Sequence, residues 1–426
     1  MKTTQAPRGC EEYHRSLTSR RSFLKGLGVV SAGGVMATMH GTVFRQTAFA
    51  ASGQATNVLV VLSQRGGADG MSLVVPYGDP AYYLARQTIG IPQSQLLQKD
   101  GFFGLHPKLA PLEQMWMTGQ MAAVHAVGLA SPNRSHFSAI LDVEEADPGS
   151  TARVGWLNRM VGMTAPGSLH DGVQVGQSVP QTEIYGPQAM LSAVDIEKVQ
   201  IFGPPNAMGR RIQSLNNTWD HASGPIGQAG RDAMVTAAEW DPVLQTSKQP
   251  QNGASYPAGS DLGEALAQSA RLIRADVGAE VITVDHSSWD MHTDLGTLDV
   301  GDMRLMADEL AQSIAAFFTD LGTLGANVTL ITISEFGRRV VENGDAGLDH
   351  GWGNAMLVLG AGVKGGSVYA KWPGLDASET VDGDLKVTTD YRSVLYEVVN
   401  ARFPGVSLPS LFPGFAPERV GIMLGA

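Results

Sequence analysis

The chain has 426 residues, a formal net charge of −11 and a single cysteine, Cys10. Such an acidic composition disfavours non-specific binding to nucleic acid or to anionic lipid. Because Cys10 lies in an N-terminal segment with the features of an export signal, the rest of the chain can form no disulfide, and any metal must be held by oxygen and imidazole groups.

The first 50 residues are predicted to be a twin-arginine signal peptide. Residues 19–25 contain the paired arginines, an apolar stretch follows over 26–44, and residues 48–50 give a small-x-small cleavage site. We therefore expect export through the twin-arginine translocase, a transient partner, to the periplasm or the outside of the cell. A membrane anchor is the alternative, but the apolar stretch is rich in glycine and only marginally long enough to span a bilayer. Cleavage would take the formal charge from −11 to −16, because the signal carries seven basic and two acidic residues.

The first element of the mature chain, which would be residues 51–426, is an apolar strand at residues 57–62. It leads directly into a Gly-rich turn, residues 65–70, which contains Arg65 and Asp69. Asp69 is a candidate metal ligand, or alternatively a residue of an Asx-type turn. Arg65 could bind an anionic substrate group, although an ordinary ion pair would also explain a single arginine.

A helix is predicted over residues 109–119 and a second buried strand over 121–127. Residues 132–137 then open a helix, with Asn133 as a plausible N-cap. Ser135 would lie in the first turn, in the positive field of free N–H groups, where an anionic substrate group also binds well. Ser135 is therefore the candidate nucleophile. The alternative is that it only starts the helix, where serine is common.

Between about residues 152 and 260 the alternation of strands and helices weakens, and the stretch ends in a Pro-, Gly- and Ser-rich loop at 249–259. We interpret 152–260 as an insertion that covers one face of the site. Helical periodicity returns at residues 261–277 and 302–321 and again at 390–401.

Another apolar strand, residues 281–284, precedes two Asp-His pairs. Asp290 and His292 are two residues apart, so in an extended segment both side chains point to one side and could grip a divalent cation. The alternative is a polar loop. Asp285 and His286 lie closer to the strand and could be capping groups or partners of the ligands.

Residues 327–333 predict a buried parallel strand, and Glu335 follows where that strand ends. An ionised carboxylate there is costly unless it is paired or bound to a metal. Glu335 is therefore a strong ligand candidate, with an ion pair to Arg338 or Arg339 as the alternative. Arg338, like Arg65, could also bind an anion.

Asp349 lies fifteen residues after Ser334, the residue before Glu335. Asp349 and His350 are in a Gly-flanked loop before a strand at 355–359. They suit a ligand imidazole oriented by a carboxylate, or two ligands outright. Acidic and imidazole groups after several strands indicate a metal centre built from distant segments. Without a thiolate, the ligand set suits Zn²⁺, Mn²⁺, Mg²⁺ or Ca²⁺. The β-then-α order predicts an α/β fold, a mostly parallel sheet sandwiched by helices.

The motifs at residues 65–70, 133–137, 289–292, 335–338 and 349–351 together resemble the DUF1501 family. That family consists of exported bacterial proteins and looks related to the alkaline phosphatase/sulfatase superfamily. The resemblance implies the superfamily fold and assigns a role to each motif. Carried over, Asp69, Asp290, His292, Glu335 and His350 match metal ligands and Ser135 matches the nucleophile. With the residue-based candidates added, the predicted metal ligands are Asp69, Asp290, His292, Glu335, Asp349 and His350, and the predicted substrate contacts are Arg65, Asn133 and Arg338.

Two departures from the superfamily pattern matter. Phe336 follows Glu335 where many members have an imidazole ligand, and the spacing between Asp290 and His292 is shorter than usual. No cysteine lies near Ser135 to become formylglycine, which argues against an ordinary sulfatase. Two functions remain open: a metal-dependent hydrolase of phosphate or sulfate esters, small or polymeric, and a non-catalytic exported binding or assembly protein on the same scaffold.

Overall fold

The computed structural model describes residues 55–164 and 171–425. The predicted signal peptide, residues 1–50, lies outside the described residues. Within the described residues, no helix combines the length and the apolar character needed to cross a membrane.

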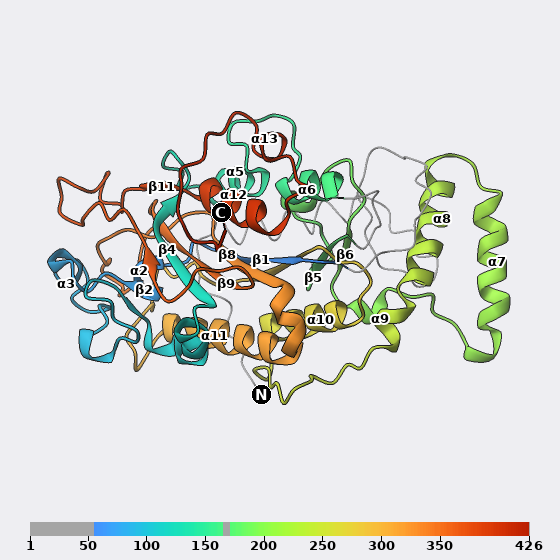
Figure 1. The fold of residues 1–426 in the computed structure, drawn as a ribbon, viewed down its shortest axis with the longest axis horizontal. Helices are drawn as coiled ribbons and strands as arrows, with labels where there is room; N and C mark the ends of the chain where they lie inside the picture. The colour runs from blue at the N-terminus through green and yellow to red at the C-terminus, as the bar shows by residue number, and fades with distance from the viewer. Residues whose placement is uncertain (1–54, 165–170, 426) are drawn as a thin grey trace.

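A nine-stranded sheet forms the centre of the molecule, in the order β10-β4-β9-β8-β1-β7-β5-β6, with β11 also paired to β4 (Figure 1). Its strands are β1 (Val58–Gln64), β4 (Met121–Gly128), β5 (Gly172–Val175), β6 (Leu191–Ala193), β7 (Val281–His286), β8 (Val328–Ile333), β9 (Asn354–Gly360), β10 (Val368–Tyr369) and β11 (Thr389–Asp390). The pairing is parallel throughout except at β9, which runs antiparallel to both β4 and β8. The predicted fold class, a mostly parallel sheet between helices, is confirmed.

Two layers of helices cover the sheet because its central strands are apolar on both faces. Alternate residues of β1 pack to opposite sides: Leu59 and Val61 in one core, Val60 and Leu62 in the other. The first core packs against α5 (His136–Glu145), α6 (Trp156–Thr164), α12 (Tyr391–Arg402) and α13 (Leu408–Leu411). The second packs against α10 (Asp261–Arg274) and α11 (Asp302–Leu321) on the opposite face (Figure 1).

The remaining elements are short or peripheral. They are α2 (Gly70–Leu73), β2 (Val74–Val75), α3 (Pro80–Ala85), β3 (Gly104–Leu105), α4 (Glu113–Met117), α7 (Met208–Asp220), α8 (Gly224–Glu239), α9 (Asp241–Gln245) and six 3₁₀ turns. The helix predicted over 109–119 is a 3₁₀ turn, Pro107–Leu112, followed by α4, because Pro111 interrupts the helix.

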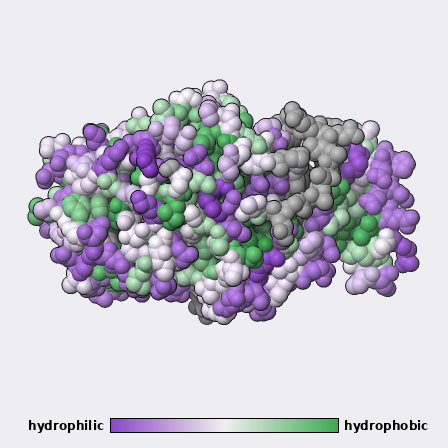
Figure 2. Space-filling view, viewed as in Figure 1, coloured by the Kyte–Doolittle hydropathy of each residue, from purple (hydrophilic) through white to green (hydrophobic). Residues whose placement is uncertain are grey.

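The stretch 152–260, predicted as an insertion, contributes two strands, β5 and β6, to one edge of the main sheet. Its helices α7 and α8 form a pair that stands at the side of the molecule (Figure 1). Figure 2 shows that the outer edge of this pair is hydrophilic.

The register of the central strands brings the candidate loops together. β1 pairs in parallel with β7 and with β8, so that Gln64 lies opposite His286 and Ser63 opposite Ile333. All three strands therefore end at one edge of the sheet, and the loops that follow them meet there.

Candidate metal centre

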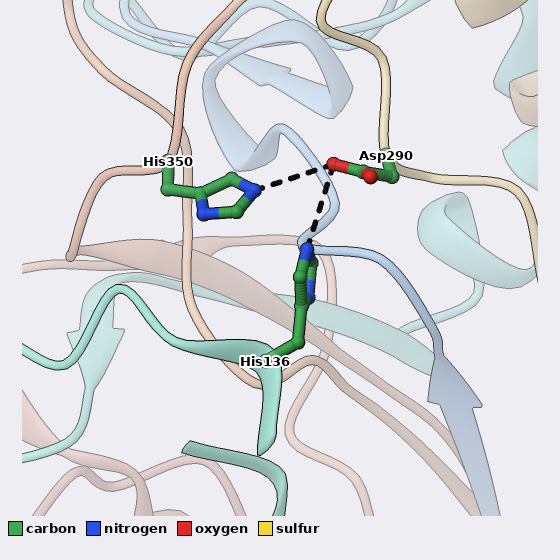
Figure 3. A group of neighbouring side chains, drawn as sticks. All are labelled: His136, Asp290 and His350. Atoms are coloured by element: carbon green, nitrogen blue, oxygen red, sulfur yellow. Dashed lines mark hydrogen bonds and ion pairs between the residues drawn. The ribbon is translucent and has the colours of Figure 1, made fainter. Parts of the chain in front are cut away.

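Three loops and the start of α5 converge on a group of imidazole and carboxylate side chains. His136 is the first residue of α5, Asp290 follows β7, and His350 lies in the loop before β9 (Figure 3). One ligand atom from each lies within 4.8 Å of the others. His292 adjoins the same group.

Asp290 Oδ1 is the common neighbour of the imidazoles. It lies 3.6 Å from Nε2 of His136, 3.4 Å from Nε2 of His350 and 3.2 Å from Nε2 of His292. The Nε2 atoms of His292 and His350 are 3.0 Å apart. A tetrahedral ion with metal–ligand bonds of about 2.0–2.1 Å holds its donors about 3.4 Å apart, so these spacings suit one cation.

The other nitrogen of each imidazole is bound by an oxygen outside the group. Nδ1 of His136 lies 2.8 Å from Glu335 Oε1, and Nδ1 of His292 lies 3.0 Å from Asp349 Oδ1. Nδ1 of His350 donates to the backbone carbonyl of Arg134 at 2.8 Å. Carboxylates and carbonyls only accept, so all three Nδ1 atoms carry hydrogen. This pattern fixes the tautomer of metal-binding histidines, because it leaves the Nε2 lone pair for the metal.

His292 and His350 contact each other through their Nε2 atoms. With hydrogen on both Nδ1 atoms, two neutral imidazoles present Nε2 lone pairs to each other at 3.0 Å. That contact is repulsive unless a proton or a metal cation lies between the nitrogens. The donors therefore fit a divalent cation, and imidazole with carboxylate oxygen is the set that Zn²⁺ prefers in the absence of thiolate.

The electrostatics of the group favour positive charge. Burial by itself raises the pKa of Asp290, but contact with His136, His292 and His350, whose Nε2 atoms donate to Oδ1 only when the rings are protonated, and the charge of Arg338 hold the pKa far below its ordinary value. Burial lowers the pKa of His136, and without a cation the hydrogen bonds of the protonated ring to Asp290 and Glu335 outweigh burial and raise the pKa to about 9. The pKa of buried Glu335 is lowered, because contact with His136 outweighs the effect of burial.

Glycines and one aromatic ring shape the site. Gly66 has φ +114°, and a Cβ built there would lie 2.6 Å from the backbone nitrogen of Asp290. Gly67 has φ +74°, and its Cβ would meet the ring of Phe336 at 2.5 Å. Phe336 in turn packs against His136 and His350, with ring centroids 4.8 and 4.7 Å away. The phenyl ring thus holds both imidazoles in place rather than supplying a ligand.

The structure brings together three of the six predicted metal ligands, namely Asp290, His292 and His350. Glu335 and Asp349 do not face the centre of the group. They contact Nδ1 of His136 and Nδ1 of His292, respectively, and so orient these two imidazoles. Asp69 differs most from the prediction. Its carboxylate is bound by both terminal nitrogens of buried Arg86, which satisfies its charge without a cation.

The predicted substrate contacts are committed to other partners. Buried Arg338 donates to the carbonyls of Gly66, Gly67, Trp289 and Leu348 and to Asp290 Oδ1, so it braces the site rather than opening toward a ligand.

The same holds for the other two. Arg65 is buried against Glu144, Asp285 and Gln181. Asn133 is not the N-cap: Ser135 is, and Asn133 Oδ1 accepts from Ser135 N and Ser138 Oγ instead. Ser135, the predicted nucleophile, is half-buried and directly precedes His136.

His136 and Arg86 were missed from the sequence. His136 lies inside the motif 133–137, and the only available signal was an imidazole next to the candidate nucleophile. Arg86 gave no signal, because its contact with Asp69 depends on the packing of α3 beside the turn after β1.

Fold and site together define an α/β protein with a group of histidines and an aspartate, suited to a cation, at the carboxyl ends of its central strands. The chain belongs to the family described as "Protein of unknown function (DUF1501)", whose model matches residues 56–398, and the predicted family is thereby confirmed. No curated protein matches the chain.

Among solved structures, the chain is similar to the alkaline phosphatase from the Antarctic bacterium TAB5 (11% identity, 75% of this chain and 95% of that chain, TM-score 0.31). It is also similar to the C-terminal periplasmic domain of EcEptC from Escherichia coli in complex with Zn (10% identity, 91% and 92%, TM-score 0.34). A third is the PsFucS1 sulfatase from Pseudoalteromonas sp. (9% identity, 96% and 75%, TM-score 0.36).

Proposed function

We propose that this protein is an exported hydrolase of phosphate or sulfate esters that depends on a divalent cation, with Zn²⁺ the best fit. His136, Asp290, His292 and His350 would hold the cation. Export by the twin-arginine translocase to the periplasm or beyond is part of the proposal, and rests on the motif at residues 19–25.

The observation that carries the proposal is the anchoring of all three imidazoles by Nδ1 while each Nε2 faces Asp290 Oδ1. Structural histidines in a core rarely need three outward anchors that leave three lone pairs converging on one point. When bound, the cation would supply the positive charge that stabilises charge developing on the transferring group of an ester.

The residues of the chain supply positioning and a nucleophile. Ser135 is the N-cap of α5, and its side chain forms no capping hydrogen bond with the helix. It lies next to His136 at the positive end of a ten-residue helix, where an anionic ester group is favoured. Glu335 holds His136 in orientation, and Arg338 holds Asp290.

A second candidate function is a non-catalytic exported protein that binds a cation as a structural element. The observation that favours it is the internal use of Arg65, Asn133 and Arg338, which leaves none of the three predicted contacts for substrate.

The experiment that separates the two is a turnover assay on protein loaded in turn with Zn²⁺, Mn²⁺, Mg²⁺ and Ca²⁺, with phosphate mono- and diesters and sulfate esters as substrates. Ser135→Ala should abolish turnover while the bound metal is retained. Ser138→Ala is the matched control, an exposed serine of the same helix, and should leave turnover unchanged. Stoichiometric metal without turnover of any ester by the unmodified protein would refute the hydrolase and leave the second candidate.

A further inference from the structure

A second concave site lies at the carboxyl ends of β5, β6 and β7. It is a cleft of about 560 Å³, within the size range of small-molecule sites. The end of β7 and the turn after it, residues 285–288, line the cleft together with the first turns of α10 and the first half of α11. None of the cation-binding side chains described above lines this cleft.

The walls combine an apolar surface with acidic groups. The apolar side chains are Val175, Val194, Leu262, Ala265 and Met306. The charged ones are Asp195, Asp261, Glu264, Asp285 and Glu309, against a single lysine, Lys198. Asp285 is neutralised by Arg65, and Lys198 lies 3.8 Å from Asp195. Asp261 and Glu264 are exposed and form no ion pair with another described residue, so the cleft keeps a net negative charge.

The buried imidazole of His286 is among the side chains that line the cleft. The side chain of His286 is only 4% exposed, and its Nε2 lies 3.4 Å from Glu309 Oε2. Its Nδ1 is buried and has no hydrogen-bond partner among the described residues. Because Nε2–H faces a carboxylate, the neutral ring carries a lone pair on Nδ1, which calls for a donor. Leaving such an atom unpaired is unfavourable.

We propose that this cleft binds a small aliphatic amine. The ammonium groups would lie against Asp261, Glu264 and Glu309 and donate to His286 Nδ1, and the methylene chain would cover the apolar wall. A bare metal ion would leave that wall uncovered, and a neutral polyol would leave the carboxylates uncompensated. The site does not depend on the proposed hydrolase activity.

Isothermal titration of the full protein with putrescine at 0.15 M salt tests the proposal. We expect saturable binding of one equivalent, weakened at least tenfold by the double substitution Asp261→Asn/Glu264→Gln. His286→Phe, which keeps a ring beside Trp289 but removes both nitrogens, should also weaken binding about tenfold. The matched control is Asp220→Asn/Asp241→Asn, two exposed carboxylates outside the cleft, and should leave the affinity unchanged.

Two further ligands distinguish recognition from surface charge. Butane-1,4-diol has the chain without the charge, and Mg²⁺ has the charge without the chain; neither should bind the cleft or displace putrescine. Equal loss of affinity in the control variant, displacement by Mg²⁺ at equal charge, or unchanged affinity in Asp261→Asn/Glu264→Gln would overturn the proposal. If His286→Phe does not fold, the affinity of the Asp261→Asn/Glu264→Gln variant decides the test.

Discussion

Replacing Glu335 with glutamine should weaken cation binding without removing a donor atom from the site. Glu335 Oε1 accepts hydrogen bonds from Gly66 N at 2.9 Å and from His136 Nδ1 at 2.8 Å. The side-chain carbonyl of glutamine can accept both, so the geometry survives and only the negative charge behind His136 is lost. The imidazole then becomes a poorer electron donor.

The expected loss is 10- to 100-fold in metal affinity, the range for partners that orient metal-binding histidines. This equals about 1.4–2.7 kcal/mol, since each factor of ten is about 1.4 kcal/mol. Asp349→Asn makes the equivalent change behind His292, but the Asp349 side chain is 55% exposed. Water screens that charge, so its loss should be less than tenfold.

Competition with a chromogenic Zn²⁺ chelator at pH 7.5 measures both affinities, and elemental analysis of purified His350→Ala provides the reference for loss of a direct donor. Circular dichroism should confirm that each variant is folded. An unchanged affinity in Glu335→Gln, or a larger loss in Asp349→Asn than in Glu335→Gln, would refute the assignment of Glu335 as the partner of a metal-binding His136.

Three other predictions concern the frame around the site. Arg338→Lys should lower the free energy of unfolding by about 3–5 kcal/mol, because one ammonium cannot replace the five hydrogen bonds of a buried guanidinium. Urea unfolding measures this free energy, and a decrease below about 1 kcal/mol would contradict the prediction. Gly66→Ala should lower cation affinity, because its Cβ would displace Asp290. Chelator competition measures this affinity, and an unchanged value would show that the backbone can move to accept the Cβ. His106 Nδ1 accepts from Lys108 N, and burial with the charge of Lys108 lowers its pKa to about 4, so the folded state resists protonation. Its contribution to stability is present above the ordinary pKa of about 6.5 and falls by about 3 kcal/mol as the pH drops to 4. His106→Asn keeps the acceptor without the titration, and urea unfolding at pH 7 and pH 4.5 should show the smaller acid loss in the variant.

The strands were predictable because a buried parallel strand is a run of apolar residues, and such runs stand out. The predicted strand at 327–333 is β8, Val328–Ile333, and the helix predicted at 302–321 has the predicted bounds. The rule that ligands gather at carboxyl ends of parallel strands then located the loops that carry Asp290, Glu335 and His350. The strand predicted at 355–359 is β9, Asn354–Gly360, but its apolar run did not reveal that it runs antiparallel to β4 and β8.

The roles within those loops were not predictable, because each depends on which partner a side chain meets. The helix containing Ser135 was expected to start near Asn133, and its actual start at His136 sets the direction of that imidazole.

The charges around the histidines suit one divalent cation better than two. The charge of Asp69 is cancelled by Arg86, so the carboxylate expected to bind a metal from the first strand is already compensated. Around the histidines, Asp290, Glu335 and Asp349 contribute three negative charges and Arg338 contributes one positive charge. With neutral imidazoles the balance is −2, which one divalent cation neutralises and a second would reverse. Buried Arg86 and Arg338 thus neutralise carboxylates that would otherwise call for a further cation.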